Sequence, residues 1–172
     1  MKNMKNLEII PVGNGSNKYP GNFTKKENKI IIENCSLKGN VLHLFSGKSK
    51  IGNVRVDFEF GNCTIDVFNY LNNINSVKDC NFKTVIIDAP YNQKFANKYK
   101  KLGNTSKQFI IFANTLQTTI LWNKIREINP DIIILKSWNY YIPKGYNLKK
   151  GYLCYPGGYR KSTILLIMKK CG

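Results

Sequence analysis

Four short apolar runs follow one another in the first half of the chain, and each ends at a turn that carries polar residues or glycine. The run 41–45 leads into the loop Ser46-Gly47-Lys48-Ser49-Lys50-Ile51-Gly52, and the runs 54–57 and 64–67 each carry an acid at or near their end. The fourth run, 84–87, continues into Asp88-Ala89-Pro90-Tyr91. Apolar runs of this length, bounded by turn residues, are typical of buried strands. Their succession predicts an α/β domain built on a mostly parallel sheet.

Taken in this order, the runs resemble the class I S-adenosylmethionine-dependent methyltransferases. Within that class they are similar to the amino-methyltransferases with an Asp/Asn-Pro-Pro-aromatic motif, such as small adenine-specific enzymes of phages and prokaryotes. The resemblance covers roughly residues 20 to 170. It implies a Rossmann-like, seven-stranded, mostly parallel sheet with a C-terminal antiparallel hairpin. It also implies an enzyme that methylates an exocyclic amino group of a nucleic-acid base, adenine N6 before the others, with S-adenosyl-L-methionine as cofactor.

The resemblance assigns the catalytic motif to Asp88, Ala89, Pro90 and Tyr91. The Asp88 side chain and the Ala89 carbonyl are expected to accept hydrogen bonds from the target amine, and Tyr91 to stack on the base. Alanine stands where the family has its first proline, which keeps the carbonyl but loosens the turn.

The residues expected at the cofactor are Phe23, His43, Phe45, Ser46, Gly47, Asp57, Asp66 and Val67. Asp57 is expected to accept the ribose hydroxyls, as acids do after the second strand of nucleotide-binding sheets, or else to be a strand-end acid. Asp66 and Val67 are expected at the adenine of the cofactor, although Asp66 is also typical of a helix cap. Phe23 is expected to pack against the cofactor, and residues 45–47 to approach its methionine end through backbone groups.

Two further features depart from the family pattern. His43 is the only histidine and stands where the first strand of the family usually carries an acid. The loop 46–52 also reaches the next strand too soon to hold the usual helix. These departures leave open a second interpretation, in which the chain is a catalytically degenerate, nucleic-acid-binding subunit of a larger complex.

The charge of the chain is +17, and it lies mostly in the second half. Fifteen Lys and Arg residues follow Asp88, against Glu127 and Asp131, and aromatic residues stand among them. Such a mixture neutralises phosphates and stacks on unpaired bases, which favours a nucleic acid, DNA or RNA, as partner. The alternative is a lysine-rich surface produced by an AT-biased genome. The residues expected at the substrate are Tyr91, Trp138, Tyr159 and Arg160.

The remaining sequence predicts the outline of one domain. Residues 1–22 are expected to be a partly disordered N-terminal extension, and residues 23–172 a single methyltransferase domain. We expect a helix over 107–129, a strand at 131–135, and a hairpin formed by 151–155 and 162–168. We expect no separate target-recognition domain, so sequence selectivity should be short, supplied by a protein partner or a homodimer, or replaced by recognition of RNA shape.

The sequence also bears on cellular setting. Its five cysteines are scattered, form no C-x-x-C pair and accompany one histidine, so we expect free thiols in a reducing, cytoplasmic compartment and no metal site. No apolar run approaches the ~20 residues that span a bilayer, and no signal peptide or membrane association is expected.

Overall fold

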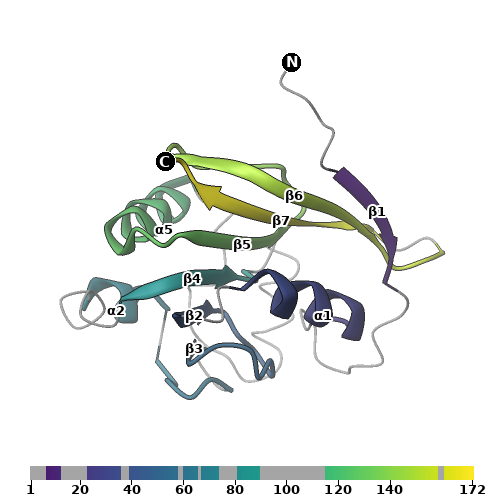
Figure 1. The fold of residues 1–172 in the computed structure, drawn as a ribbon. Coiled ribbons are helices and arrows are strands. Elements are labelled where there is room, and N and C mark those ends of the chain that lie inside the picture. The colour runs from purple at the N-terminus through teal and green to yellow at the C-terminus, as the bar shows by residue number, and fades with distance from the viewer. Residues whose placement is uncertain are drawn as a thin grey trace.

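The computed structural model describes residues 7–12, 23–35, 39–57, 60–65, 67–73, 81–89, 115–158 and 161–172. They form an α/β fold around a seven-stranded mixed sheet in the order β1-β6-β7-β5-β4-β2-β3 (Figure 1). The strands are β1 (Leu7–Pro11), β2 (Asn40–Leu44), β3 (Val54–Val56), β4 (Phe82–Ile87), β5 (Ile132–Ser137), β6 (Tyr146–Tyr155) and β7 (Thr163–Lys170). The described helices are α1 (Lys25–Asn34), α2 (Val67–Asn72) and α5 (Thr115–Ile128). Every neighbouring pair is parallel except the two pairs that β7 makes.

The two faces of the sheet are covered by different helices because successive side chains of a strand point to opposite faces. On one face, apolar residues of the strands pack with residues of α2 and α5, including Leu71, Leu121 and Ile125. On the other face, Val41, Ile86 and Ile134 belong to a cluster with Ile31 of α1. The central strands are therefore buried on both sides, which explains their continuous apolar runs.

The mixed, mostly parallel sheet and its C-terminal antiparallel hairpin confirm the coarse prediction of an α/β fold. The structure places β5 at Ile132–Ser137 and gives β6 more residues than the predicted 151–155. Helix α5 ends before Pro130, as predicted, and Asn129 follows it with a φ of 55°, a conformation common for asparagine after a helix. Residues 107–114 of the predicted helix lie outside the described residues.

Two predictions about the strands are wrong. The run 64–67 forms no strand: Cys63 makes a single parallel bridge to Val56, and α2 already begins at Val67. The seventh strand is instead β1, within the segment for which no element was expected. β1 pairs in parallel with β6, and residues 1–6 and 13–22 lie outside the described part of the chain.

Helix α1 was not predicted, although its start has a recognisable signature. Thr24 and Glu27 form a capping box, in which the Thr24 hydroxyl accepts from the Glu27 amide at 3.3 Å and the Glu27 carboxylate accepts from the Thr24 amide at 2.7 Å. Between β2 and β3 the chain forms turns and no helix, as the short loop predicted.

Among the described helices, none is long and apolar enough to cross a membrane.

Candidate functional site

The order of the strands reverses direction at the carboxyl ends of β2 and β4. The chain passes from β2 outward to β3 and then returns to the opposite side of β2 with β4. Such a reversal of direction is a topological switch point, where open α/β sheets bind their ligands. The predicted loop 45–47 follows β2 and the predicted pair Asp88-Ala89 follows β4, so both stand at this point. The Asp88 amide also donates to the Leu44 carbonyl at 3.3 Å, which joins the two segments.

The turn after β2 has an unusual backbone. Phe45 and Gly47 have φ values of 59° and 49°, and glycine adopts this region freely whereas a bulky residue does so rarely. The Ser46 amide donates to the Val56 carbonyl at 3.2 Å, so the turn is anchored to the end of β3. A strained aromatic at the end of a central strand is typical of a ligand-binding turn.

Asp57 holds this turn from the end of β3. Its buried carboxylate accepts a hydrogen bond from the Gly47 amide at 3.0 Å and another from the Phe60 amide at 3.2 Å. Asp57 and the turn 45–47, which were expected at different parts of the cofactor, therefore lie in direct contact. The carboxylate therefore also has a structural role, because the buried Gly47 amide would otherwise lack an acceptor.

Two buried polar atoms near the turn have no hydrogen-bond partner among the described residues. They are Nε2 of His43 and Oγ of Ser46. His43 lies on the α1 face of β2 and is fully buried, with its ring 5.7 Å from that of Phe23. Because Nδ1 lies 3.0 Å from the Ile51 carbonyl, which can only accept, Nδ1 carries the hydrogen and Nε2 is an acceptor. Buried polar atoms are rarely left unpaired, and these two are available to a ligand at the turn. Asn28 Oδ1, Arg55 Nε and Trp122 Nε1 also lack a partner among the described residues, so an unpaired atom alone does not mark a site.

Burial makes His43 neutral. Desolvation lowers the pKa of its imidazole to about 4, and the Ile51 hydrogen bond offsets only part of that effect. A neutral imidazole with its hydrogen on Nδ1 offers one acceptor to a ligand, as a carboxylate would, but without the charge.

Asp88 and Ala89 are both buried. Ile86 belongs to the α1 face and Ile87 to the opposite face, so alternation directs the Asp88 side chain toward the α1 face. Ala89 belongs to the cluster on the α2 and α5 face, where the small side chain is enclosed. Pro90 and Tyr91 lie outside the described residues.

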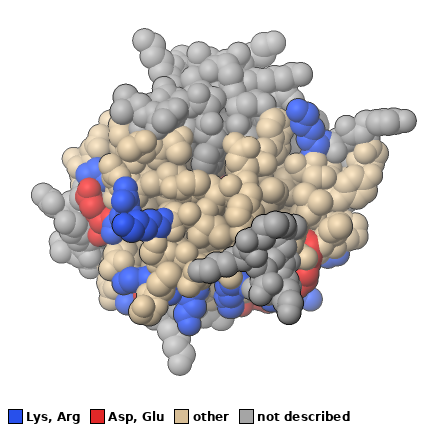
Figure 2. Space-filling model, turned by 90° about the horizontal axis from the view of Figure 1, so that it is seen from above, with Lys and Arg blue, Asp and Glu red and all other residues tan. Residues whose placement is uncertain are grey.

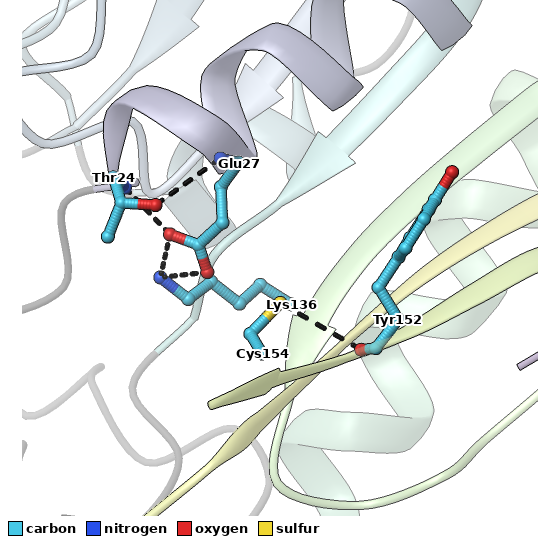
Figure 3. Close-up of polar contacts among 5 residues, drawn as sticks. All are labelled: Thr24, Glu27, Lys136, Tyr152 and Cys154. Carbon is cyan, nitrogen blue, oxygen red and sulfur yellow. Dashed lines mark hydrogen bonds and ion pairs between the residues drawn. The ribbon is translucent and has the colours of Figure 1, made fainter. Parts of the chain in front are cut away.

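Lys136, the register neighbour of Asp88 on β5, and its partner Glu27 were not predicted as site residues. Lys136 of β5 and Glu27 of α1 form a buried ion pair, with Nζ 3.2 Å from Oε1 and 3.3 Å from Oε2 (Figure 3). The Lys136 ammonium also lies 5.0 Å from the centre of the Phe23 ring. Glu27 could have been noticed as the fourth residue of a Thr-x-x-Glu capping box, whereas no local pattern marks Lys136.

The other predicted site residues are distributed as follows. Trp138 follows β5 at the same edge of the sheet, half-buried, with the Lys161 ammonium 4.9 Å from its ring. Val67 is the first residue of α2 and is buried in the same core cluster as Phe45. Asp66, Tyr159 and Arg160 lie outside the described residues.

Basic side chains are spread over the surface rather than gathered in one stripe on the face drawn in Figure 2. There, Lys and Arg appear at several separate places around a broad area of other residues, and acids are few. Four of the ten acidic residues form ion pairs with lysines on the described surface, as in Lys29–Glu33 and Lys83–Asp131. Within the part of the chain that is described, no group of three or more His, Cys, Asp or Glu could hold a metal ion.

Comparisons of the chain with models of protein families, with curated proteins and with solved structures find no significant match.

We predict that His43 makes stability depend on pH. Its folded pKa of about 4 lies below the ordinary 6.5, so the unfolded chain takes up the proton first as the pH falls. Stability from this group is complete above pH 6.5 and is lost between pH 6.5 and pH 4, by about 3 kcal/mol. Urea unfolding at pH 7 and pH 4 should show this loss.

The control for this prediction is His43→Asn, which removes the titrating group and keeps a polar atom near the Ile51 carbonyl. The variant should lose less stability than the wild type over the same pH interval. Equal losses in the two proteins would contradict a depressed histidine pKa.

Proposed function

We propose that this protein is an S-adenosyl-L-methionine-dependent methyltransferase that acts on an exocyclic amino group of a nucleic-acid base, adenine N6 before guanine or cytosine. The fold in this proposal is the Rossmann-like class I methyltransferase fold. The observation that carries it is the arrangement at the switch point. Asp88 and Ala89 directly follow β4, beside the turn after β2 in which Phe45 has a positive φ. Buried polar atoms of His43 in β2 and of Ser46 in the turn have no partner among the described residues.

The residues at the turn fit the polar groups of such a cofactor. Nε2 of His43 and Oγ of Ser46 offer hydrogen bonds that no described residue takes. His43 stands where the first strand of the family usually carries an acid. Its neutral imidazole can accept a hydrogen bond through Nε2, as a carboxylate would, but it carries no charge. Asp57 is the candidate acceptor for the ribose hydroxyls of the cofactor. The Phe23 ring is the candidate apolar surface against which the cofactor packs. When bound, S-adenosyl-L-methionine supplies a methyl group on an electrophilic sulfonium.

Asp88 and Ala89 act on the substrate amine in this proposal. The lone pair of an aromatic amine is delocalised into its ring, which makes the nitrogen a poor nucleophile. The Asp88 carboxylate and the Ala89 carbonyl accept its two N–H groups, favour a pyramidal nitrogen and free the lone pair. Holding that nitrogen in line with the methyl group provides much of the remaining acceleration, so no strong general base is needed.

The nucleic-acid half of the proposal is supported by charge and by aromatic residues. The net charge is +17, and Trp138 stands at the same edge of the sheet as Asp88 with Lys161 over its ring. Exposed Tyr140 and Tyr141 follow it. Aromatic faces stack on unpaired bases, and basic groups neutralise the phosphates around them. The target base must be unpaired or flipped out of its stack to reach Asp88.

A degenerate, non-catalytic subunit is the second candidate, and one observation favours it. The Asp57 carboxylate already accepts two backbone hydrogen bonds, which leaves fewer acceptor sites for ribose hydroxyls. Binding of the cofactor separates the two candidates, because a thermal shift with S-adenosyl-L-methionine is expected of the enzyme and not of a degenerate scaffold.

The first test of the proposal is Asp88→Ala. Methyl transfer should fall by ~10²-fold or more, because a positioned acceptor is lost, whereas cofactor affinity should hardly change. The assay uses labelled cofactor with DNA and with RNA, followed by identification of the methylated nucleoside. Asp131→Ala is the matched control, since Asp131 is an exposed acid before β5 that pairs with Lys83. Activity of Asp88→Ala within about tenfold of wild type would refute the catalytic assignment.

The second test is Asp57→Ala. If Asp57 holds the cofactor ribose, calorimetry should show S-adenosyl-L-methionine binding weakened by ~1.5–3 kcal/mol, the range for hydrogen bonds to a charged group. The protein should also be less stable without cofactor, because the Gly47 and Phe60 amides lose their acceptor. Lower stability with an unchanged dissociation constant would confine Asp57 to that structural role.

The third test concerns the nucleic acid. Affinity for a single-stranded oligonucleotide should fall steeply with salt, and Lys161→Ala should reduce the slope of log K against log salt by about one if Lys161 contacts a phosphate. Lys29→Ala is the control, because Lys29 is an exposed lysine that already pairs with Glu33. Affinity that does not change with salt would point to a small-molecule or protein substrate instead.

A further inference from the structure

A buried ion pair joins two segments that are far apart in the sequence. Lys136 and Glu27 are 109 positions apart, and their side chains are only 8% and 1% exposed. The Lys136 ammonium reaches both carboxylate oxygens of Glu27, and one of these oxygens also accepts from the Thr24 amide (Figure 3). The free-energy cost of removing two charges from water often exceeds the gain from their attraction. A contribution to stability alone therefore explains this buried pair poorly.

Asp88 is the third charge of this cluster. β4 and β5 are paired in parallel with Ile87 opposite Leu135, so Asp88 and Lys136 are the next residues of neighbouring strands. Ile86 and Ile134 both belong to the α1 face, and alternation therefore brings the side chains of Asp88 and Lys136 to that same face. Adjacent strands lie about 4.8 Å apart, within range of a strong charge interaction.

The electrostatics agree with this geometry. Burial alone would lower the pKa of Lys136, but the carboxylates of Asp88 and then of Glu27 outweigh burial and raise the pKa. Lys136 therefore remains an ammonium, and its interaction with Asp88 is reciprocal: the ammonium stabilises the ionised carboxylate.

Three more titratable groups described on this face, Cys154, His43 and Cys35, are neutral, and burial raises the pKa of the Cys35 thiol to about 11. The Cys154 thiol of β6 has its pKa raised to about 12, by burial and then by Glu27, and the His43 imidazole of β2 has its pKa lowered to about 4 by burial. The charged groups of this cluster are thus one ammonium, that of Lys136, and two carboxylates, those of Glu27 and Asp88. Lys136 is shared between two carboxylates.

We propose that Lys136, anchored by Glu27, is the positioning residue that keeps Asp88 ionised and oriented as an acceptor. Its consequence for catalysis rests on the methyltransferase function proposed above. A protonated Asp88 would present an O–H donor on one oxygen and would be a poor acceptor for the substrate amine. Glu27 in turn shares the charge of Lys136, so Asp88 does not neutralise the ammonium alone.

The proposal predicts opposite effects from two nearly isosteric substitutions. Lys136→Met removes the cation and should raise the pH midpoint of Asp88 protonation, by ~1–3 pH units. Glu27→Gln removes the competing carboxylate and should lower that midpoint. Carbon-13 NMR of labelled aspartate carboxyls measures both, because the chain has only five aspartates and Asp88→Asn identifies the signal. A merely structural ion pair would not move the midpoint in opposite directions.

Two control proteins support this test. Lys124→Met removes the ammonium of another Lys–Glu pair, with a separation of 3.2 Å but on α5 and partly exposed, and should leave the Asp88 midpoint unchanged. The double variant Lys136→Met/Glu27→Gln avoids a lone buried carboxylate if Lys136→Met fails to fold. Its midpoint should still rise, because Lys136 is the register neighbour of Asp88 on the adjacent strand, whereas Glu27 reaches the cluster from α1 and pairs with Lys136.

Methyl transfer provides the second readout. The acid limb of kcat/KM should move to higher pH in Lys136→Met, with about a tenfold loss of activity on that limb for each pH unit by which it moves. An unchanged NMR midpoint in both Lys136→Met and the double variant, or midpoints that move in the same direction in Lys136→Met and Glu27→Gln, would overturn the assignment. If the wild type transfers no methyl group, the proposed function fails, while the NMR midpoints still decide whether Lys136 controls Asp88.

Discussion

The parallel pairing of β2 with β4 is the contact on which the candidate site depends. It brings the turn after β2 and the Asp88-Ala89 pair to one edge of the sheet, although the two lie about forty residues apart in the sequence. The Asp88 amide then bonds the last carbonyl of β2, so the two turns are held in register. Because the strands are buried on both faces, a slip of one residue would turn Asp88 away from α1 and is strongly disfavoured.

Three of the few acidic residues of the chain are buried near this edge of the sheet. The chain has 27 basic residues and only ten acids, yet three of those acids (Glu27, Asp57 and Asp88) are buried in the described structure. Asp57 accepts hydrogen bonds from backbone amides, and Glu27 forms an ion pair with Lys136. Asp88 interacts electrostatically with the same ammonium. The surface carries the basic excess, and the interior uses its few acids for hydrogen bonds and for neutralising one buried cation.

The positions that differ from the methyltransferase pattern which the sequence resembles preserve different interactions. His43 in place of an acid keeps a hydrogen-bond acceptor, because Nδ1 donates to the Ile51 carbonyl and Nε2 is left without a partner among the described residues. Ala89 keeps the backbone carbonyl and buries its small side chain against the α2 and α5 face. The short β2–β3 connection omits a helix, and Asp57 instead secures the turn through the Gly47 amide.

The sequence by itself determined the elements whose signals are local. Apolar runs predicted β2, β4, β5 and the β6–β7 hairpin, and Pro130 predicted the end of α5, because side-chain periodicity and missing backbone donors act within a few residues. Tertiary structure decided the rest. The run at 64–67 lost its strand to a helix start, and β1 became a strand only because β6 offered it an unpaired edge. The Glu27–Lys136 pair beside Asp88 exists only after α1 and β5 meet over the sheet, since no local pattern can encode a contact across 109 positions.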